Sequence, residues 1–271
     1  MYNHRFWLSD APRLLILLTA ALWVTGRAEK TETATDGTPQ VRGVSDTEIV
    51  LGTHTDLSGA IATLGVDGAN GTRMRFEEAN AAGGIHGRTI RFVVEDNQYQ
   101  VPKAIQAANK LINRDKIFAM VTAIGTQTNN AVLTTQLDAG VPNLFPITGA
   151  RSMVEPPHKL KFHARGIYYD EIRAAMKYFV EEKGVQTPCA IYQDTEYGQE
   201  ILEAAIDQAK AMGITLAETS AHKPTESEFT SAILRLREAN CDLVLMGTVV
   251  RDTILVLEAA RKLGWGDVAW V

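Results

Sequence analysis

The chain has little of several residue types, and each shortage excludes a class of protein. Two cysteines among 271 residues exclude a disulfide-dense scaffold and a zinc site built from cysteines. Lysine and arginine number 27 against 32 aspartates and glutamates, a net charge of −5, so no basic surplus supports nucleic-acid binding. The remainder, 45% hydrophobic and 22% charged, is typical of a globular protein with one large or two small domains.

Motifs of the common enzyme classes are also missing. There is no G-x-S-x-G nucleophile elbow and no G-x-x-x-x-G-K-[ST] phosphate loop. Residues 264–269 fit G-x-G-x-x-A, but they precede a predicted strand, whereas a dinucleotide site follows one. The six histidines show no metal-binding spacing, and the position of His54 in a predicted strand favours a packed residue. We therefore predict a protein that is not an enzyme and uses no cofactor or metal.

The N-terminus has the layout of an export signal. Arg5 and Arg13 precede an apolar run over residues 14–24, which is about half as long as a membrane-spanning helix. Small residues at Gly26 and Ala28 follow, so we predict a signal peptide over residues 1–28. An uncleaved N-terminal anchor is the alternative. Residues 29–43 are polar and without periodicity, which predicts a flexible lead-in.

From residue 49 onward, short apolar strands alternate with amphipathic helices. Pro156 and Pro157 interrupt this pattern, which then restarts, so we predict an N-terminal lobe over 44–155 and a C-terminal lobe over 156–271. Strands are expected at 49–55, 89–95, 118–122, 141–145, 189–194, 215–218, 242–247 and from 268. This alternation predicts an α/β fold of two Rossmann-like lobes with parallel sheets. The pattern stops within a strand, so the second lobe is expected to be incomplete.

The most informative local feature is the corner between a strand and a helix at Gly125 and Thr126. The first N–H groups of a helix lack intrahelical partners and carry partial positive charge, which makes such a corner an anion site. Ordinary capping by Thr126 or Thr128 is the alternative. The segments 56–59 and 146–149 end neighbouring strands at the same sheet edge, and Tyr197 is expected to face them from the second lobe. A tyrosine that merely packs in a loop is the alternative for Tyr197.

The two cysteines suggest a pairing. Cys189 and Cys241 each lie at the start of a predicted strand, and the two strands are neighbours in a 2-1-3 sheet order. We hypothesise a Cys189–Cys241 disulfide, which an exported protein retains. The alternative is a pair of buried free thiols.

Several segments in combination resemble a known family. Residues 55–97, beginning "TDLSGAIATLGVDGANG", look like the opening of the periplasmic binding proteins for branched-chain amino acids, and "VTAIGTQTNNA", "AGVPNLFPITGA" and "QDTEYGQE" continue the match. The resemblance covers residues 44–271. It implies a type I periplasmic binding protein, a small-molecule solute such as an amino acid as ligand, permease subunits of an ABC importer as partner, and a periplasmic location.

The resemblance also implies roles for single residues. Thr126, beside Gly125, falls where the family binds the ligand carboxylate, and Ile147 and Gly149 fall where it binds the ligand's polar end. Gly149 has no hydroxyl, although Thr148 adjoins it. Leu64 falls on the residue that covers the ligand side chain, and Tyr197 on a second-lobe tyrosine. The family's next tyrosine falls at Val249 or Val250, and its ammonium-binding acid is expected beyond Val271. These departures leave open a different amino acid, an amide or a urea-like solute.

These observations lead to one principal function and two alternatives. We expect a solute-binding protein whose lobes close around an amino acid of branched-chain type for an importer. A sensory receptor domain for amino acids, amides or urea has the same lobes and is the first alternative. A hydrolase on a similar frame is the second, without support from any motif.

Overall fold

A computed structural model describes residues 41–271. The predicted signal peptide (1–28) and the predicted lead-in as far as residue 40 lie outside the described residues. Gln40–Val271 forms one compact unit. None of the helices described in this unit has the length and apolar character to cross a bilayer.

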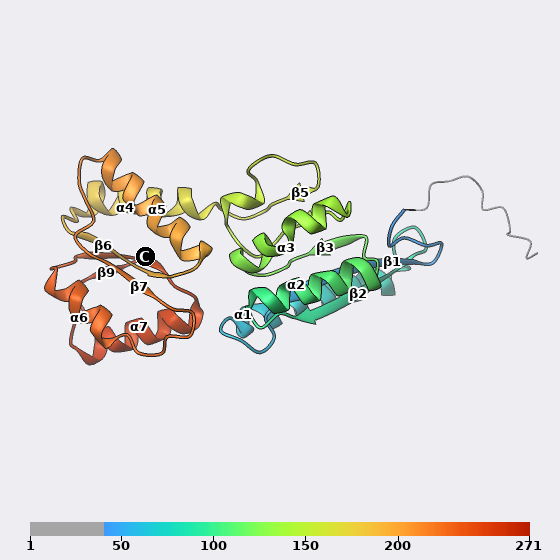
Figure 1. The fold of residues 1–271 in the computed structure, drawn as a ribbon, viewed down its shortest axis with the longest axis horizontal. Coiled ribbons are helices and arrows are strands. Elements are labelled where there is room, and N and C mark those ends of the chain that lie inside the picture. Colours follow the sequence, from blue (N-terminus) through green and yellow to red (C-terminus); the bar gives the residue numbers. More distant parts are fainter. Residues whose placement is uncertain (1–40) are drawn as a thin grey trace, which may run out of the picture. The chain divides into compact units, whose positions relative to one another are not determined.

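Within residues 41–271 the strands form two parallel sheets, as the alternating sequence pattern predicts (Figure 1). The first has the order β2-β1-β3-β4-β5, and we call residues 48–162, which carry it, the first half. Its strands are β1 (Glu48–Thr55), β2 (Thr89–Asp96), β3 (Ala119–Val121), β4 (Asn143–Leu144) and β5 (Lys161–Phe162). Its helical segments are α1 (Ala62–Ala81), α2 (Val101–Asn109), the π-helical η1 (Lys110–Arg114), α3 (Thr126–Asp138) and the 3₁₀ turn η2 (Arg151–Met153).

The second sheet has the order β7-β6-β8-β9, and we call residues 168–270, which carry it, the second half. Its strands are β6 (Pro188–Gln193), β7 (Thr219–His222), β8 (Leu243–Gly247) and β9 (Ala269–Trp270). Its helices are α4 (Tyr168–Lys183), α5 (Glu196–Ala211), α6 (Thr230–Glu238) and α7 (Val250–Lys262). Both sheets place the second strand of their half at one edge and the first strand beside it, which is the crossover pattern of doubly wound folds.

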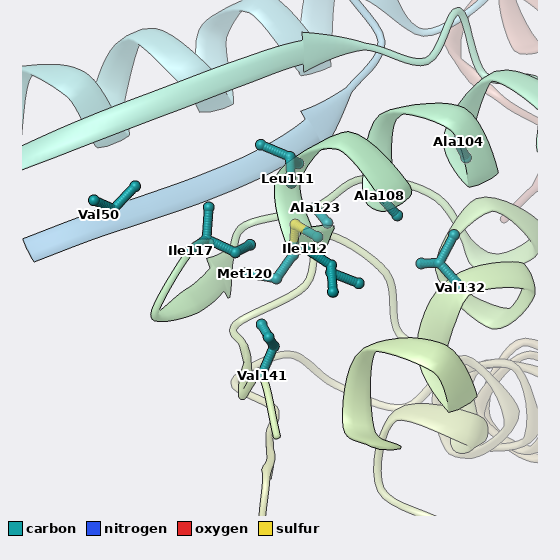
Figure 2. Close-up of a cluster of buried hydrophobic side chains, with 10 residues drawn as sticks. All are labelled: Val50, Ala104, Ala108, Leu111, Ile112, Ile117, Met120, Ala123, Val132 and Val141. Carbon is teal, nitrogen blue, oxygen red and sulfur yellow. The ribbon is translucent and has the colours of Figure 1, made fainter. Parts of the chain in front are cut away.

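The cores form where the apolar faces of helices meet the sheets. Figure 2 shows one cluster of the first half, in which Leu111 and Ile112 of η1 pack with Ile117 and Met120. These four side chains are at most 1% exposed. Burying an aliphatic side chain of this size contributes about 1.5–3 kcal/mol, so this cluster fixes the positions of β1 and β3 and of the loops that follow them.

Two sequence expectations about the strands need correction. The strand expected at 215–218 lies at Thr219–His222 instead. Ile214 and Leu216 are apolar because they pack against a buried cluster and not because they lie in a sheet. The strand expected at 141–145 is confined to Asn143–Leu144. The predicted division of the lobes at residue 155 stays a prediction, although β5, which pairs with β4, lies beyond it.

A disulfide joins two elements of the second half. The structure links Cys189 to Cys241 with an S–S distance of 1.99 Å, the pairing that the sequence suggests. Cys189 is the second residue of β6, and Cys241 lies two residues before β8, which pairs with β6 in parallel. Both cysteines belong to a buried apolar cluster that also contains Ile191 and Val244.

Candidate functional site

A cavity of about 140 Å³ lies where segments of both halves meet. From the first half it is lined by Ile61, Leu64, Tyr99, Ile124, Gly125, Thr126 and Ile147. From the second half it is lined by Tyr168, Tyr197, Thr248, Val249 and Val250. Most of these residues follow a strand directly or begin the next helix, so the cavity lies beyond the carboxyl ends of the strands, where open α/β sheets bind ligands. Its volume resembles that of cavities that hold a molecule of about the size of benzene.

The start of α3 supplies the most polar part of the wall. Gly125 precedes the helix with φ +95°, and no side chain caps the first turn. A Cβ atom at Gly125 would lie 2.6 Å from the ring of Tyr99 and 2.5 Å from Oγ1 of Thr128, so this position requires glycine. Within the described chain, the backbone N–H groups of Thr126, Gln127 and Thr128 have no hydrogen-bond acceptor. The amide of Gly125 donates to the carbonyl of Ile147 at 3.2 Å.

The hydroxyl of Thr126 is positioned by a hydrogen bond to Thr148, a residue outside the cavity wall. Its Oγ1 lies 2.8 Å from Oγ1 of Thr148, and Thr126 is 2% exposed. Thr148 also accepts a hydrogen bond from the amide of Ala150 at 3.3 Å. Thr148 is 1% exposed and does not line the cavity, although the sequence places it among the ligand-binding residues. Its geometry suits a residue that orients Thr126.

Gly149 likewise lies outside the cavity wall. Its lack of a side chain explains how the ring of Tyr168 can approach the cavity. A Cβ atom at Gly149 would lie 2.8 Å from the ring of Tyr168 and 2.5 Å from the carbonyl oxygen of Gly166. The carbonyl of Gly149 accepts a hydrogen bond from the amide of Tyr168 at 2.8 Å. The missing side chain at residue 149 therefore allows Tyr168 to approach closely enough for its ring to line the cavity.

Three of the described lining residues are tyrosines from separate parts of the chain. Tyr168 is the first residue of α4 and Tyr197 the second residue of α5, and their ring centroids lie 5.2 Å apart with the planes inclined by 71°. The hydroxyl of Tyr197 donates to the carbonyl of Thr248 at 3.3 Å. Tyr99 follows β2 with φ +55°, and its amide donates to Oδ1 of Asn97 at 2.8 Å. Burial raises the pKa of both Tyr99 and Tyr197, so both hydroxyls stay protonated at neutral pH.

Aliphatic side chains complete the cavity wall. Ile61, Ile124 and Val249 form a buried cluster that joins the two halves. Leu64, placed in the site by sequence, lines the cavity and is 42% exposed. Val250 lines it at the start of α7. Apart from the α3 corner, the wall therefore favours an apolar ligand surface.

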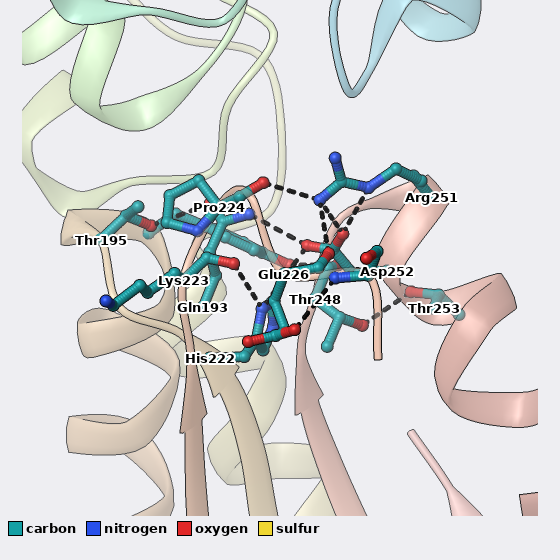
Figure 3. A network of polar contacts seen from close by, with 12 residues as sticks. Gln193, Thr195, His222, Lys223, Pro224, Glu226, Thr248, Arg251, Asp252 and Thr253 are labelled. Carbon is teal, nitrogen blue, oxygen red and sulfur yellow. Dashed lines mark hydrogen bonds and ion pairs between the residues drawn. The ribbon is translucent and has the colours of Figure 1, made fainter. Parts of the chain in front are cut away.

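A buried polar network fixes the start of α7 (Figure 3). The carboxylate of Asp252 accepts hydrogen bonds from Nε2 of Gln193 at 3.0 Å and from Nε of Arg251 at 2.9 Å. Arg251 also donates to the carbonyl of Pro224 at 2.6 Å. Asp252 is fully buried, and Nδ1 of His222 lies 3.8 Å from its Oδ2. These contacts tie the ends of β6 and β7 to the segment that presents Val249 and Val250.

Metal ligands are not gathered in the described part of the chain, where no group of three or more His, Cys, Asp or Glu residues is placed to hold an ion. His54 is fully buried in β1 and its Nδ1 lies 3.0 Å from Nδ2 of Asn97. Burial lowers the pKa of His54 to about 4, so its imidazole is neutral at pH 7. His54 is therefore a packed structural residue, which agrees with its place in a strand.

Of the seven residues that the sequence predicts to bind ligand, five line the cavity and two, Thr148 and Gly149, lie outside its wall. On the wall are Leu64, Gly125, Thr126, Ile147 and Tyr197. The sequence missed Tyr99 and Tyr168 as lining residues. Tyr99 had a signal, since it follows a predicted strand at the same edge as residues 56–59. Tyr168 had none, because its approach depends on Gly149 and on the crossing between the halves.

Comparison with known proteins identifies relatives for most of the chain. A family described as "Periplasmic binding protein" matches residues 48–270. The Leu/Ile/Val/Thr-binding protein of Salmonella typhimurium is 24% identical over 208 residues, which is 77% of this chain and 57% of that protein. The Leu/Ile/Val-binding protein homolog 8 of Brucella abortus is 26% identical over 237 residues, which is 82% of this chain and 57% of that protein.

Solved structures show the same fold. A substrate-binding periplasmic protein from Ralstonia solanacearum superposes with a TM-score of 0.77 and 24% identity, covering 82% of this chain and 62% of that one. The likeness supports an α/β fold of parallel sheets, as the sequence predicts. The chain spans 57% of the length of the two curated relatives.

Proposed function

We propose that this chain, which belongs to the periplasmic binding protein family, captures a small solute of amino-acid type in the cavity between its two halves. The relatives are named for binding leucine, isoleucine and valine, and one of them for threonine as well. We propose the same kind of role here, in the periplasm, with delivery of the solute to the permease subunits of an ABC importer.

The observation that carries the proposal is the unpaired first turn of α3. The amides of Thr126, Gln127 and Thr128 have no acceptor in the described chain, and Thr126 lies on the cavity wall. A carboxylate at this corner would gain from the helix dipole and from charge-assisted hydrogen bonds of about 1.5–3 kcal/mol each. Two or three such bonds are enough for micromolar binding, which needs about −8 kcal/mol, once burial of an apolar body is added.

Closure of the halves around the solute is the proposed mechanism. Polar contacts already connect them: the amide of Arg151 donates to Oε1 of Glu200 at 3.0 Å, and Asn130 donates to Glu196. Glu196 and Glu200 lie on α5, which begins beside the cavity with Tyr197. Closing excludes water from the corner of α3, which strengthens its hydrogen bonds to an anion. A closed form distinct from the open one is what a permease would recognise.

Replacement of the threonine hydroxyl tests the proposal. The solute that binds most tightly is first chosen from L-leucine, L-valine, L-alanine, acetamide and urea. In the full-length protein, Thr126→Ala is expected to weaken the binding of that solute by tenfold or more. Titration calorimetry measures the affinity, and circular dichroism checks the fold. Thr135→Ala, at an exposed position on the same helix, is the matched control and should bind as the unmodified protein does. Equal affinity of the Thr126 and Thr135 variants would refute the assignment.

A further inference from the structure

We propose that Gly68 of α1 determines how large a solute side chain the cavity admits, because it leaves room for the side chain of Ile147. Gly68 lies outside the cavity wall, whereas Ile147 forms part of it. This inference rests on the proposed function, since it concerns the apolar side chain of an amino-acid solute. It makes Gly68 a positioning residue, which acts on specificity through Ile147 and without touching the solute.

The N-terminal part of α1 presents one face to the cavity. Ile61, which precedes the helix, and Leu64 both line the cavity. Gly68 follows Leu64 by four residues and therefore lies on the same face of the helix. A Cβ atom at Gly68 would lie 2.8 Å from Cδ1 of Ile147, well inside the optimal separation of about 3.5–4.0 Å between carbon atoms. A methyl group at position 68 would therefore collide with the end of the Ile147 side chain.

The backbone of α1 is held in place on both sides of Gly68. Three residues before it, the carbonyl of Gly65 accepts a hydrogen bond from Oγ1 of Thr55, the last residue of β1, at 3.3 Å. Four residues after it, Oγ1 of Thr72 lies 3.2 Å from Oγ1 of Thr122, which follows β3. These contacts fix the helix against the ends of two strands, so the helix cannot move to relieve a collision without breaking them.

The backbone of Ile147 is fixed as well. Its amide donates to the carbonyl of Ala123 at 2.8 Å, and its carbonyl accepts from the amide of Gly125 at 3.2 Å. These two bonds form a parallel bridge between Ile147 and Ile124. A collision at Gly68 is therefore relieved by movement of the Ile147 side chain. Because folded interiors are close-packed, the free space beside that side chain is the cavity, and a larger residue at position 68 makes the cavity narrower.

Amino acids that differ only in the side chain measure the width of the cavity. L-alanine, L-valine and L-leucine share the carboxylate and the ammonium, so a ratio of two affinities cancels the contacts at the α3 corner. In titration calorimetry of the full-length protein, we expect Gly68→Ala to lower the ratio of leucine to valine affinity by about tenfold, which is the effect of one methylene group in an apolar pocket. If only leucine or only valine binds, its affinity in Gly68→Ala is compared with that in the unmodified protein.

Two further variants separate a narrowed cavity from a disturbed helix. Gly71→Ala makes the same change three residues further along α1, where a Cβ atom would meet nothing within 4 Å, and should leave the affinities unchanged. Gly68→Ala/Ile147→Val removes Cδ1, the atom with which the new methyl group collides, and should recover at least threefold of the lost preference for leucine. If Gly68→Ala does not fold, this double variant must still fold and bind leucine, since the inference attributes the strain to Cδ1.

The remaining outcomes distinguish this inference from the proposed function. A leucine-to-valine ratio that is unchanged in Gly68→Ala, equally reduced in Gly71→Ala or not recovered in the double variant would overturn the inference and leave the proposed function standing. Binding of L-alanine alone by the unmodified protein would do the same, because the room beside Ile147 would then not limit the solute. Absence of binding by all three amino acids would overturn both.

Discussion

The two halves share an architecture but offer the cavity different chemistry. The first half leaves the amides of Thr126 and its two successors without acceptors at the corner of α3. The second half gathers buried polar side chains in the network around Asp252 and contributes tyrosine rings and valines to the cavity wall. The part of the cavity wall that the second half supplies is therefore mainly aromatic and aliphatic, and the α3 corner is supplied by the first half. The comparison indicates that two copies of one fold can supply chemically different parts of a single cavity wall.

The halves also differ in what stabilises them, and the largest predicted effect follows from that difference. The disulfide lies in the second half and closes a loop with a sequence separation of 52 residues. A cross-link of this span stabilises a fold by about 4 kcal/mol through the entropy of the unfolded chain. The double variant Cys189→Ala/Cys241→Ala is therefore expected to lose about this much free energy of unfolding, measured by urea denaturation.

Hydrogen exchange locates the effect of this double variant. Amides of β6 and β8 should exchange faster in it, whereas those of β1 and β2 should change little, because the cross-link joins segments of the second half alone. Equal acceleration in both sheets would show that the two halves unfold as one unit and do not differ in what stabilises them.

The next largest predicted effect is a dependence of the free energy of unfolding on pH, and it arises in the first half. Burial lowers the pKa of His54 to about 4, against an unfolded value of 6.5. The unfolded state therefore binds a proton before the folded state does, so the contribution of neutral His54 is fully present above pH 6.5 and is lost as the pH falls toward 4. The loss amounts to about 3 kcal/mol over that window.

Measurement of unfolding free energies at pH 7 and pH 4.5 tests this expectation. His54→Gln keeps a polar group near Asn97 but removes the titration, so its stability should fall less over the same interval. The matched control is His158→Gln, at an exposed position between β4 and β5 of the first sheet. If the His54 and His158 variants showed the same pH dependence, another group would have to be responsible.

The order of strands and helices could be predicted from the sequence, because apolar residues recur with different periods in helices and in strands. The β6 strand and the corner of α3 follow from local rules, a buried run ending at a polar turn. The strand at Thr219–His222 was misplaced because its alternating burial is weaker than the apolar signal of Ile214 and Leu216 just before it. An apolar pattern in the sequence indicates that a segment is buried. It does not indicate whether that segment forms hydrogen bonds with a neighbouring strand.

The site was predictable only where a residue's role depends on its own segment. Thr126 could be placed in this way, from the corner between strand and helix, whereas Leu64 was placed only through the family resemblance. Thr148 could not, since its hydroxyl is turned toward Thr126 by contacts with residues 22 positions away in sequence. Tyr168 reaches the cavity through the space that Gly149 leaves, a relation between two segments that no periodicity encodes.

The smallest predicted effect concerns the contact that joins the halves. The guanidinium of Arg151, which follows β4, pairs with Glu203 and lies 3.5 Å from Glu200, both on α5, and stacks 4.1 Å from the ring centroid of Tyr169. Partly exposed pairs of this kind contribute up to about 1 kcal/mol and weaken with salt. If they favour the closed arrangement, Arg151→Met should reduce solute affinity about two- to fivefold at low salt, with a smaller difference at 1 M salt.

The control for this variant is Arg75→Met, because Arg75 pairs with Glu78 within α1 and bridges nothing between the halves. Calorimetry at both salt concentrations should show no change in affinity for Arg75→Met. An equal loss in both variants would mean that the effect comes from net charge and not from the contact. A loss that is confined to Arg151→Met and fades with salt would show that the contact between Arg151 and α5, the helix that carries Tyr197, supports solute binding.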